Sequence, residues 1–113
     1  MNTSDFTSAI LTSFAILRQV TKVDLHTDGA IVKGRAFLNG EIFLAFYYNQ
    51  ITMTQSFALI KDTERIWGID FEVIHGWHLH PLGKPDNHLA IQAQEISSIV
   101  EMLKGVLDIL TSK

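Results

Sequence analysis

The alternation of apolar and polar residues predicts two helices separated by a run of strands. Near the start of the chain, apolar residues recur at near-helical spacing: Phe6, Ile10, Phe14 and Leu17. Thr3 or Ser4 can cap the first turn, because their side-chain oxygens accept from free backbone N–H groups. The pattern therefore predicts a helix from about Ser4 to about Val20.

The last part of the chain carries a stronger helical pattern. Its apolar residues follow the i, i+3, i+4, i+7 spacing: Ile96, Ile99, Val100, Leu103, Val106, Leu107 and Leu110. Its charged residues fall on the other side: Glu95, Glu101, Lys104 and Asp108. Ser98 with Glu101 matches a capping box, which predicts an amphipathic helix from Ser98 to Leu110 packed on the apolar face of a sheet.

Between the helices the period changes to that of strands. Five runs are expected: Lys22 to His26, Ile31 to Leu38, Glu41 to Asn49, Ser56 to Lys61 and Arg65 to Phe71. Asp28-Gly29 and Asn39-Gly40 are strong hairpin turns, so consecutive strands should pair antiparallel. The third run is apolar on both faces, which predicts a central strand covered on each side.

These elements define the expected fold class. It is α+β, a five-stranded antiparallel meander sheet with an N-terminal helix and a C-terminal amphipathic helix packed on it. The chain has 113 residues, of which 47% are hydrophobic, so residues 1–113 fit a single domain with a real core.

Composition narrows the classes of function. The absence of cysteine excludes disulfides and thiolate chemistry and favours a cytoplasmic location. No secretory signal is recognisable, and no apolar run approaches the roughly 20 residues that span a bilayer, so no membrane association is expected. The net charge is −3 and the sequence shows no basic face, so tight non-specific binding to nucleic acid is not expected.

The candidate functional residues are most concentrated between Gly76 and His88. This segment holds three of the five histidines and both prolines. Strand side chains alternate, so His78 and His80 should point to one side while their apolar neighbours anchor the strand in the core. Pro81 ends the pairing, and the Gly- and Pro-rich turn that follows can bring His88 back toward the other two imidazoles.

The function predicted for this segment is that of a metal-independent ribonuclease, which cleaves RNA by acid–base catalysis and needs no cofactor. An imidazole titrates near neutral pH, so one ring can take the 2′-hydroxyl proton while another protonates the leaving oxygen. The expected residues are His78, His80 and His88 as catalytic groups, Lys84 and Arg65 to neutralise the phosphate, and Tyr47 to contact the substrate.

Two alternatives stay open. The same three histidines, with Asp70 or Asp86, can bind zinc or another divalent metal and form a metal-binding hydrolase. The third hypothesis is a non-enzymatic interaction module, in which the histidines contact a protein partner. The sequence alone therefore leaves open whether the protein is an enzyme.

The order of these parts resembles the TumE-type toxins of bacterial toxin–antitoxin pairs, over roughly the last two-thirds of the chain. The corresponding positions are Asp70, then His78 and His80 before Pro81, then His88, then the closing helix. The family's Asp-Asn-Ala-Pro-His-His-Pro is here a longer string with Leu79 between the histidines. The resemblance implies a prokaryotic cytoplasmic toxin with an antitoxin protein partner and possible action on RNA. A homodimer, paired through an edge strand, is a further possibility.

Overall fold

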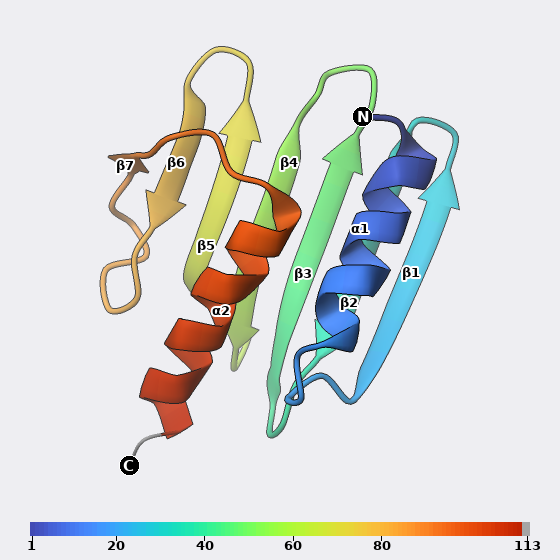
Figure 1. The fold of residues 1–113 in the computed structure, drawn as a ribbon. Coiled ribbons are helices and arrows are strands. Elements are labelled where there is room, and N and C mark those ends of the chain that lie inside the picture. Colours follow the sequence, from blue (N-terminus) through green and yellow to red (C-terminus); the bar gives the residue numbers. More distant parts are fainter. Residues whose placement is uncertain (112–113) are drawn as a thin grey trace.

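The computed structural model describes residues 1–111 and shows two helices and one seven-stranded antiparallel sheet (Figure 1). Each strand pairs with the next in the chain, so the spatial order is β1 to β7. The elements are α1 (Thr3–Ala15), β1 (Lys22–Asp28), β2 (Ile31–Phe37), β3 (Ile42–Asn49), β4 (Gln55–Lys61), β5 (Glu64–Glu72), β6 (Gly76–His80), β7 (Leu89–Ala90) and α2 (Ile96–Thr111).

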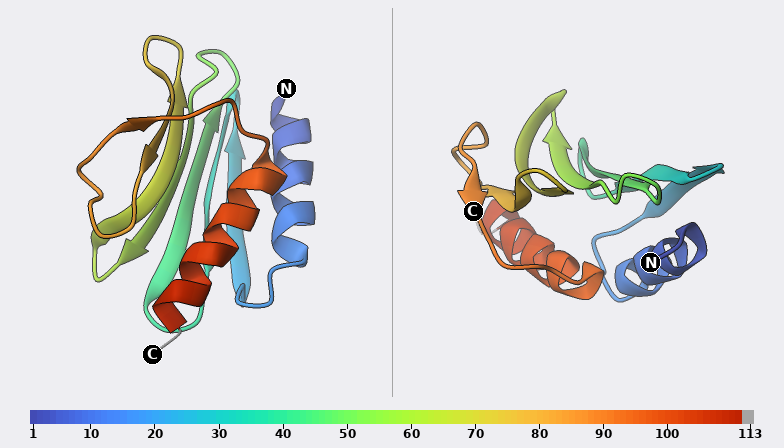
Figure 2. Two further views of the ribbon diagram at one scale, coloured as in Figure 1. Left: turned by 60° about the vertical axis from the view of Figure 1, so that its left-hand side comes forward. Right: turned by 90° about the horizontal axis from the view of Figure 1, so that it is seen from above.

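Both helices lie on the same face of the sheet, side by side (Figure 2). The core fills the layer between them. Phe6 and Ile10 of α1, and Ile99 and Leu103 of α2, are fully buried against the sheet. Within residues 1–111 the opposite face has no helix over it, and we call it the outer face.

The first helix is shorter than the sequence predicts. Asn2 is its N-cap, because the Asn2 side chain accepts from the N–H of Asp5 at 2.7 Å, so neither Thr3 nor Ser4 caps it. The helix ends at Ala15 rather than near Val20. Thr21 already donates its N–H to the carbonyl of Phe37, so the preceding residues turn toward the sheet instead of continuing the helix.

The second helix carries the predicted apolar stripe, and six of its residues are buried. It begins at Ile96, two residues before the predicted start. Ser98 therefore lies inside the first turn, where it cannot act as the N-cap of a capping box.

The five predicted strands all form, with small shifts at their ends, but the sheet has seven strands, not five. The extended run before Pro81 is a full strand, β6, which pairs with β5 from Gly68↔His80 to Glu72↔Gly76. The two-residue β7 then pairs with β6. Strand β7 has too few residues to show a period-2 pattern, so only long-range pairing reveals it.

The prediction that β3 is covered on both faces is also wrong. Leu44, Phe46 and Tyr48 are buried beneath the helices, whereas Phe43 and Tyr47 stay half-exposed on the outer face. No helix within residues 1–111 is long and apolar enough to cross a membrane.

Candidate functional site

Strand pairing brings the predicted site residues together on the outer face. Asp70 on β5 pairs directly with His78 on β6, and His80 pairs with Gly68 two positions further along. Trp77 and Leu79 point to the core side, as the alternation of strand side chains predicts. The two imidazoles and the Asp70 carboxylate therefore share one patch of the sheet.

His80 is held between two hydrogen-bond acceptors. Its Nδ1 lies 2.9 Å from the carbonyl oxygen of Pro85, and its Nε2 lies 3.0 Å from Oδ2 of Asp70. A carbonyl oxygen only accepts, so Nδ1 carries a proton and donates to Pro85. The lone pair of a neutral ring would then sit on Nε2, facing a carboxylate oxygen. That contact is favourable only if a cation, either a proton or a metal ion, lies between the two atoms.

His78 faces the same carboxylate oxygen. Its Nε2 lies 3.6 Å from Oδ2 of Asp70, and its Nδ1 makes a long contact of 3.4 Å with the carbonyl of Gly76. Like His80, His78 thus directs Nε2 toward Asp70 and Nδ1 toward a backbone carbonyl. Donation of Nδ1–H to a backbone carbonyl is one of the ways in which proteins fix the tautomer of a metal-ligating imidazole.

A turn after β6 returns His88 to the pair. Lys84 donates its N–H to Pro81, Asn87 donates to Lys84, and Gly83 adopts a φ of 87°, which favours glycine. Because Leu79 pairs with Leu89, His88 falls opposite His80 on the outer face.

The three imidazoles converge. The ring centroid of His88 lies 4.4 Å from that of His80 and 5.3 Å from that of His78, and the His78 and His80 centroids are 5.2 Å apart. One ligand nitrogen from each ring lies within 4.8 Å of the other two. His80 is buried, His78 is half-buried and His88 is exposed, so the cluster opens to solvent on the His88 side.

Arg65 reaches the site because of a β-bulge. The pairing of β4 and β5 shifts between Leu59 and Ile60, so that Leu59 pairs with Trp67 and Ile60 with Arg65, leaving Ile66 as the extra residue. A bulge reverses the alternation of side chains on the strand that contains it. Arg65 therefore projects onto the outer face, where its Nη2 donates to Oδ1 of Asp70 at 3.0 Å.

Gly68 provides the space for this guanidinium. A Cβ atom at Gly68 would lie 2.1 Å from Nη2 and 2.6 Å from Nε of Arg65. The Nε atom is buried without a hydrogen-bond partner among residues 1–111. The guanidinium is thus partly buried, and its Nη2 donates to Asp70 and makes a long contact with the carbonyl of Phe57.

The charge of Asp70 is stabilised by this arrangement. Burial acts to raise the pKa of Asp70, but the hydrogen bond and charge of Arg65 lower it. A hydrogen bond from Ser56 and the charge of His80 lower it further, so the pKa lies below the ordinary value of 3.8. Asp70 is therefore an ionised, oriented carboxylate at neutral pH.

Two hollows meet at the cluster. One, of about 500 Å³, is lined by Glu64, Arg65, His80, Pro85, Asp86 and His88. The other, of about 490 Å³, is lined by Glu72, His75, His78, His88 and Ala90. His88 borders both, so a small molecule can approach the cluster from either side. The carboxylates of Glu64 and Asp86 make the first hollow more attractive to a cation than to a phosphate.

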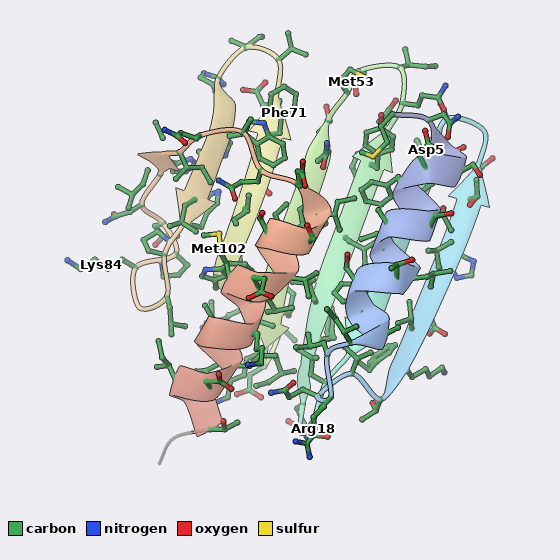
Figure 3. The ribbon with its side chains drawn as sticks, in the orientation of Figure 1. Asp5, Arg18, Met53, Phe71, Lys84 and Met102 are labelled. Carbon is green, nitrogen blue, oxygen red and sulfur yellow. The ribbon has the colours of Figure 1, made fainter. Side chains whose placement is uncertain are left out.

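The expected substrate-binding residues are not gathered in the same way. Arg65 lies at the cluster but is already paired with Asp70. Lys84 points outward from the loop before β7, away from the sheet (Figure 3). Tyr47 shares a cross-strand row with Asp70 but lies two strands away, on β3. His75 contacts Glu72 on the rim instead of joining the cluster.

Several supporting groups were not identified from the sequence. They are the carbonyl of Pro85, the hydroxyl of Ser56, and Gly68 with its space for Arg65. A backbone carbonyl carries no sequence signal, and the bulge that re-aims Arg65 depends on the register of a neighbouring strand. A glycine within a strand pattern is the one available signal, because it often marks a bulge or a close approach.

Comparison with known proteins adds no relative: no family model, no curated protein and no solved structure matches this chain.

Proposed function

We propose that this protein is a metal-dependent hydrolase. Its active centre would be a divalent transition metal ion, such as zinc, bound by His78, His80 and His88. The observation that carries the proposal is the convergence of three imidazole nitrogens within 4.8 Å of one another, beside the Oδ2 atom of Asp70. Tetrahedral zinc with Zn–N bonds of about 2.0–2.1 Å places its nitrogens about 3.3 Å apart. Side-chain movements of about 1 Å or less would close the cluster to that separation.

A divalent ion fits this cluster better than a proton does. A proton between His80 and Asp70 satisfies that pair of atoms and leaves the other two imidazoles without a role. Protonating all three rings would place like charges at ring separations of 4.4 to 5.3 Å. One divalent ion accepts the lone pairs of all three rings and also offsets the charges of Asp70, Glu64 and Asp86 nearby.

The groups behind the ligands support the same proposal. Backbone carbonyls hold the Nδ1 atoms of His78 and His80, and Arg65 holds Oδ1 of Asp70. Supporting hydrogen bonds of this kind orient metal ligands and tune their basicity. Three imidazoles leave a position open, and zinc in such a site lowers the pKa of bound water to about 7. Asp70, with its low pKa, suits the role of a fixed carboxylate that orients the water or completes the coordination.

The cellular role that we propose is that of a toxin acting on RNA, with an antitoxin as its partner. This part follows from the resemblance to the TumE-type toxins at Asp70, His78, His80 and His88. Expression of the wild-type protein should then arrest bacterial growth, and His80→Ala should relieve the arrest.

The test begins with the metal-free protein, prepared with a chelator and titrated with Zn²⁺ by calorimetry. We expect one ion per chain and at least a tenfold weaker affinity for His80→Ala and His88→Ala. The control is His26→Ala, an exposed histidine on β1 outside the cluster. Cleavage of an RNA oligonucleotide should require the metal and stop in EDTA. Absence of stoichiometric binding, or binding that survives His80→Ala, would contradict the proposal.

A second candidate is metal-free cleavage of RNA, and it is favoured by the two acceptors around His80. With a proton on each ring nitrogen, His80 would be an imidazolium held by Asp70 and Pro85, poised to act as a general acid while His78 acts as base. Cleavage would then persist in EDTA, vanish in His80→Ala and follow a bell-shaped pH–rate profile. The EDTA arm of the same experiment therefore separates the two functions.

A further inference from the structure

A second chemically distinct area lies on the outer face, over strands β1 to β3. Lys33 and Arg35 project from β2 on this face, and both are exposed. His26 lies opposite Lys33 on β1. The face is open because both helices pack on the other side of the sheet (Figure 2).

Several carboxylates on the outer face form ion pairs with residues other than Lys33 and Arg35. Asp24 pairs with Lys22 at 3.6 Å, Asp70 pairs with Arg65, and Glu72 pairs with His75. Within residues 1–111, Lys33 and Arg35 form no ion pair. Lys33 and Arg35 therefore stand two positions apart on one strand without an ion-pair partner among these residues, although Asp24 lies opposite Arg35 on β1.

Aromatic rings lie beside these cations. Phe37 and Phe43 are half-buried on the outer face, with ring centroids 6.0 Å apart. The guanidinium of Arg35 lies 4.9 Å from the centroid of Phe43, and Nζ of Lys22 lies 5.8 Å from that of Phe37. A hollow of about 410 Å³ lies beside them, lined by Asp24, His26, Lys33, Gly34, Arg35 and Phe37.

This area is continuous with the histidine cluster. The strand register places Lys33, Tyr47, Ser56 and Asp70 in one row across β2 to β5. Three inter-strand spacings of about 4.8 Å separate Lys33 from Asp70, or about 14 Å in total. Tyr47 lies between them and offers a further ring and a hydroxyl. A flexible polymer bound at β2 can therefore reach the cluster within a few units.

We propose that the outer face of β1 to β3 binds single-stranded nucleic acid, with Lys33 and Arg35 on the phosphates and Phe43 and Tyr47 against the bases. The inference rests on the proposed hydrolase, because it specifies a single-stranded substrate and the path by which that substrate reaches the cluster. Exposed cations beside aromatic rings on an open sheet are the pattern by which sheet proteins hold single strands. A duplex hides the faces of its bases, so it does not fit this surface.

Fluorescence anisotropy with a labelled single-stranded 2′-O-methyl oligouridine of about twelve nucleotides tests the surface. The measurement is made in EDTA, so that the oligonucleotide stays intact. We expect binding by the wild type and at least a tenfold loss in the double variant Lys33→Ala, Arg35→Ala. The slope of log K against log salt should also fall by about 1.4, because each lost contact to a single strand removes about 0.7. Phe43→Leu should weaken binding about fivefold, because one stacking face is lost.

The matched control is the double variant Arg18→Ala, Lys104→Ala, which removes the same two kinds of charge from the helix side. It should bind as the wild type does. Equal affinity of the two double variants, no oligonucleotide binding by the wild type, or equal binding of a duplex would each overturn the inference. Calorimetry of Lys33→Ala, Arg35→Ala with Zn²⁺ should give wild-type affinity, so loss of this surface is distinguishable from loss of the metal site.

Discussion

At the scale of single residues, Asp70 is the group on which the candidate site depends. One carboxylate oxygen accepts from Arg65, and the other faces both His80 and His78. Arg65 can occupy this place only because Gly68 has no side chain. The hydrogen bond from Arg65 to Asp70 therefore depends on the lack of a side chain at Gly68, three residues after Arg65.

Gly68→Ala tests this dependence. The added Cβ would collide with the Arg65 guanidinium and lie 2.6 Å from the carbonyl oxygen of Phe57, so the guanidinium must leave Asp70. We expect a loss of about 2–3 kcal/mol in the free energy of unfolding, from overpacking and an unpaired carboxylate. Urea unfolding followed by tryptophan fluorescence measures it.

Gly105→Ala is the control for that measurement. Gly105 lies within α2, and beyond the adjacent helix backbone nothing lies within 4 Å of its Cβ position, so alanine should stabilise the protein by up to about 1 kcal/mol. A loss below about 0.5 kcal/mol for Gly68→Ala would show that Arg65 does not depend on this space.

At the scale of elements, strands β6 and β7 position the imidazoles of His78, His80 and His88. Strand β6 places His78 and His80 from a regular ladder with β5, whereas β7 has only two residues. His88 therefore depends on the turns between Pro81 and β7. The loop, not the ladder, determines how well the third imidazole is placed.

Gly83→Ala tests the contribution of that loop. Gly83 adopts a φ of 87° with open space around it, so alanine adds backbone strain of about 1–2 kcal/mol without a clash. If the strain moves His88, Zn²⁺ affinity should fall about five- to tenfold, as measured by calorimetry.

Gly29→Ala in the β1–β2 hairpin is the matched variant. Gly29 has a φ of 58° and equally open space, so the strain is similar but far from the cluster. Its Zn²⁺ affinity should equal that of the wild type. Equal affinities for the two variants would mean that the loop does not control His88.

At the scale of the whole molecule, one face of the sheet carries the stabilising core and the other carries the candidate binding groups. The face beneath the helices holds the apolar core, and the outer face holds the histidine cluster and the cationic area on β2. Substitutions on the outer face should therefore change binding or activity with little effect on the fold. Asp70 and Gly68 are exceptions, because the partly buried charge of Asp70 and the close packing at Gly68 link the site to global stability.

The pH dependence of unfolding tests that link in metal-free protein. The pKa of Asp70 is lower in the folded state than the ordinary value of 3.8. Ionised Asp70 therefore stabilises the fold above about pH 4, and this contribution is lost as the pH falls through the folded-state pKa. Asp70→Asn should be less stable than the wild type at pH 7, by about 1–3 kcal/mol, and should lose less stability between about pH 4 and pH 2.

Asp108→Asn serves as the reference in the same series. Asp108 is exposed on α2 with a 4.0 Å contact to Lys104, so its removal should change stability little at any pH. If Asp70→Asn and Asp108→Asn gave the same pH profile, Asp70 would not have the proposed stabilising role.

The sequence by itself determined the class of fold and the segment that carries the histidine cluster. Period-3.6 stripes and Asp-Gly and Asn-Gly turns predict the helices and the meander, and alternation around Pro81 predicts that His78 and His80 share a face. These features are local, because they depend on residues a few positions apart. The ribonuclease and toxin roles and the antitoxin partner stay predictions.

Only the tertiary structure decided what surrounds the histidines. Strands β6 and β7, the bulge that turns Arg65 outward, the space at Gly68 and the Pro85 carbonyl all depend on pairing between distant segments. Alternation along the chain already places Lys33 and Arg35 on one face of their strand, but their neighbours His26 and Tyr47 are brought there only by strand pairing. Local patterns determine on which face of a strand a side chain lies, but strand register and bulges determine which residues it contacts.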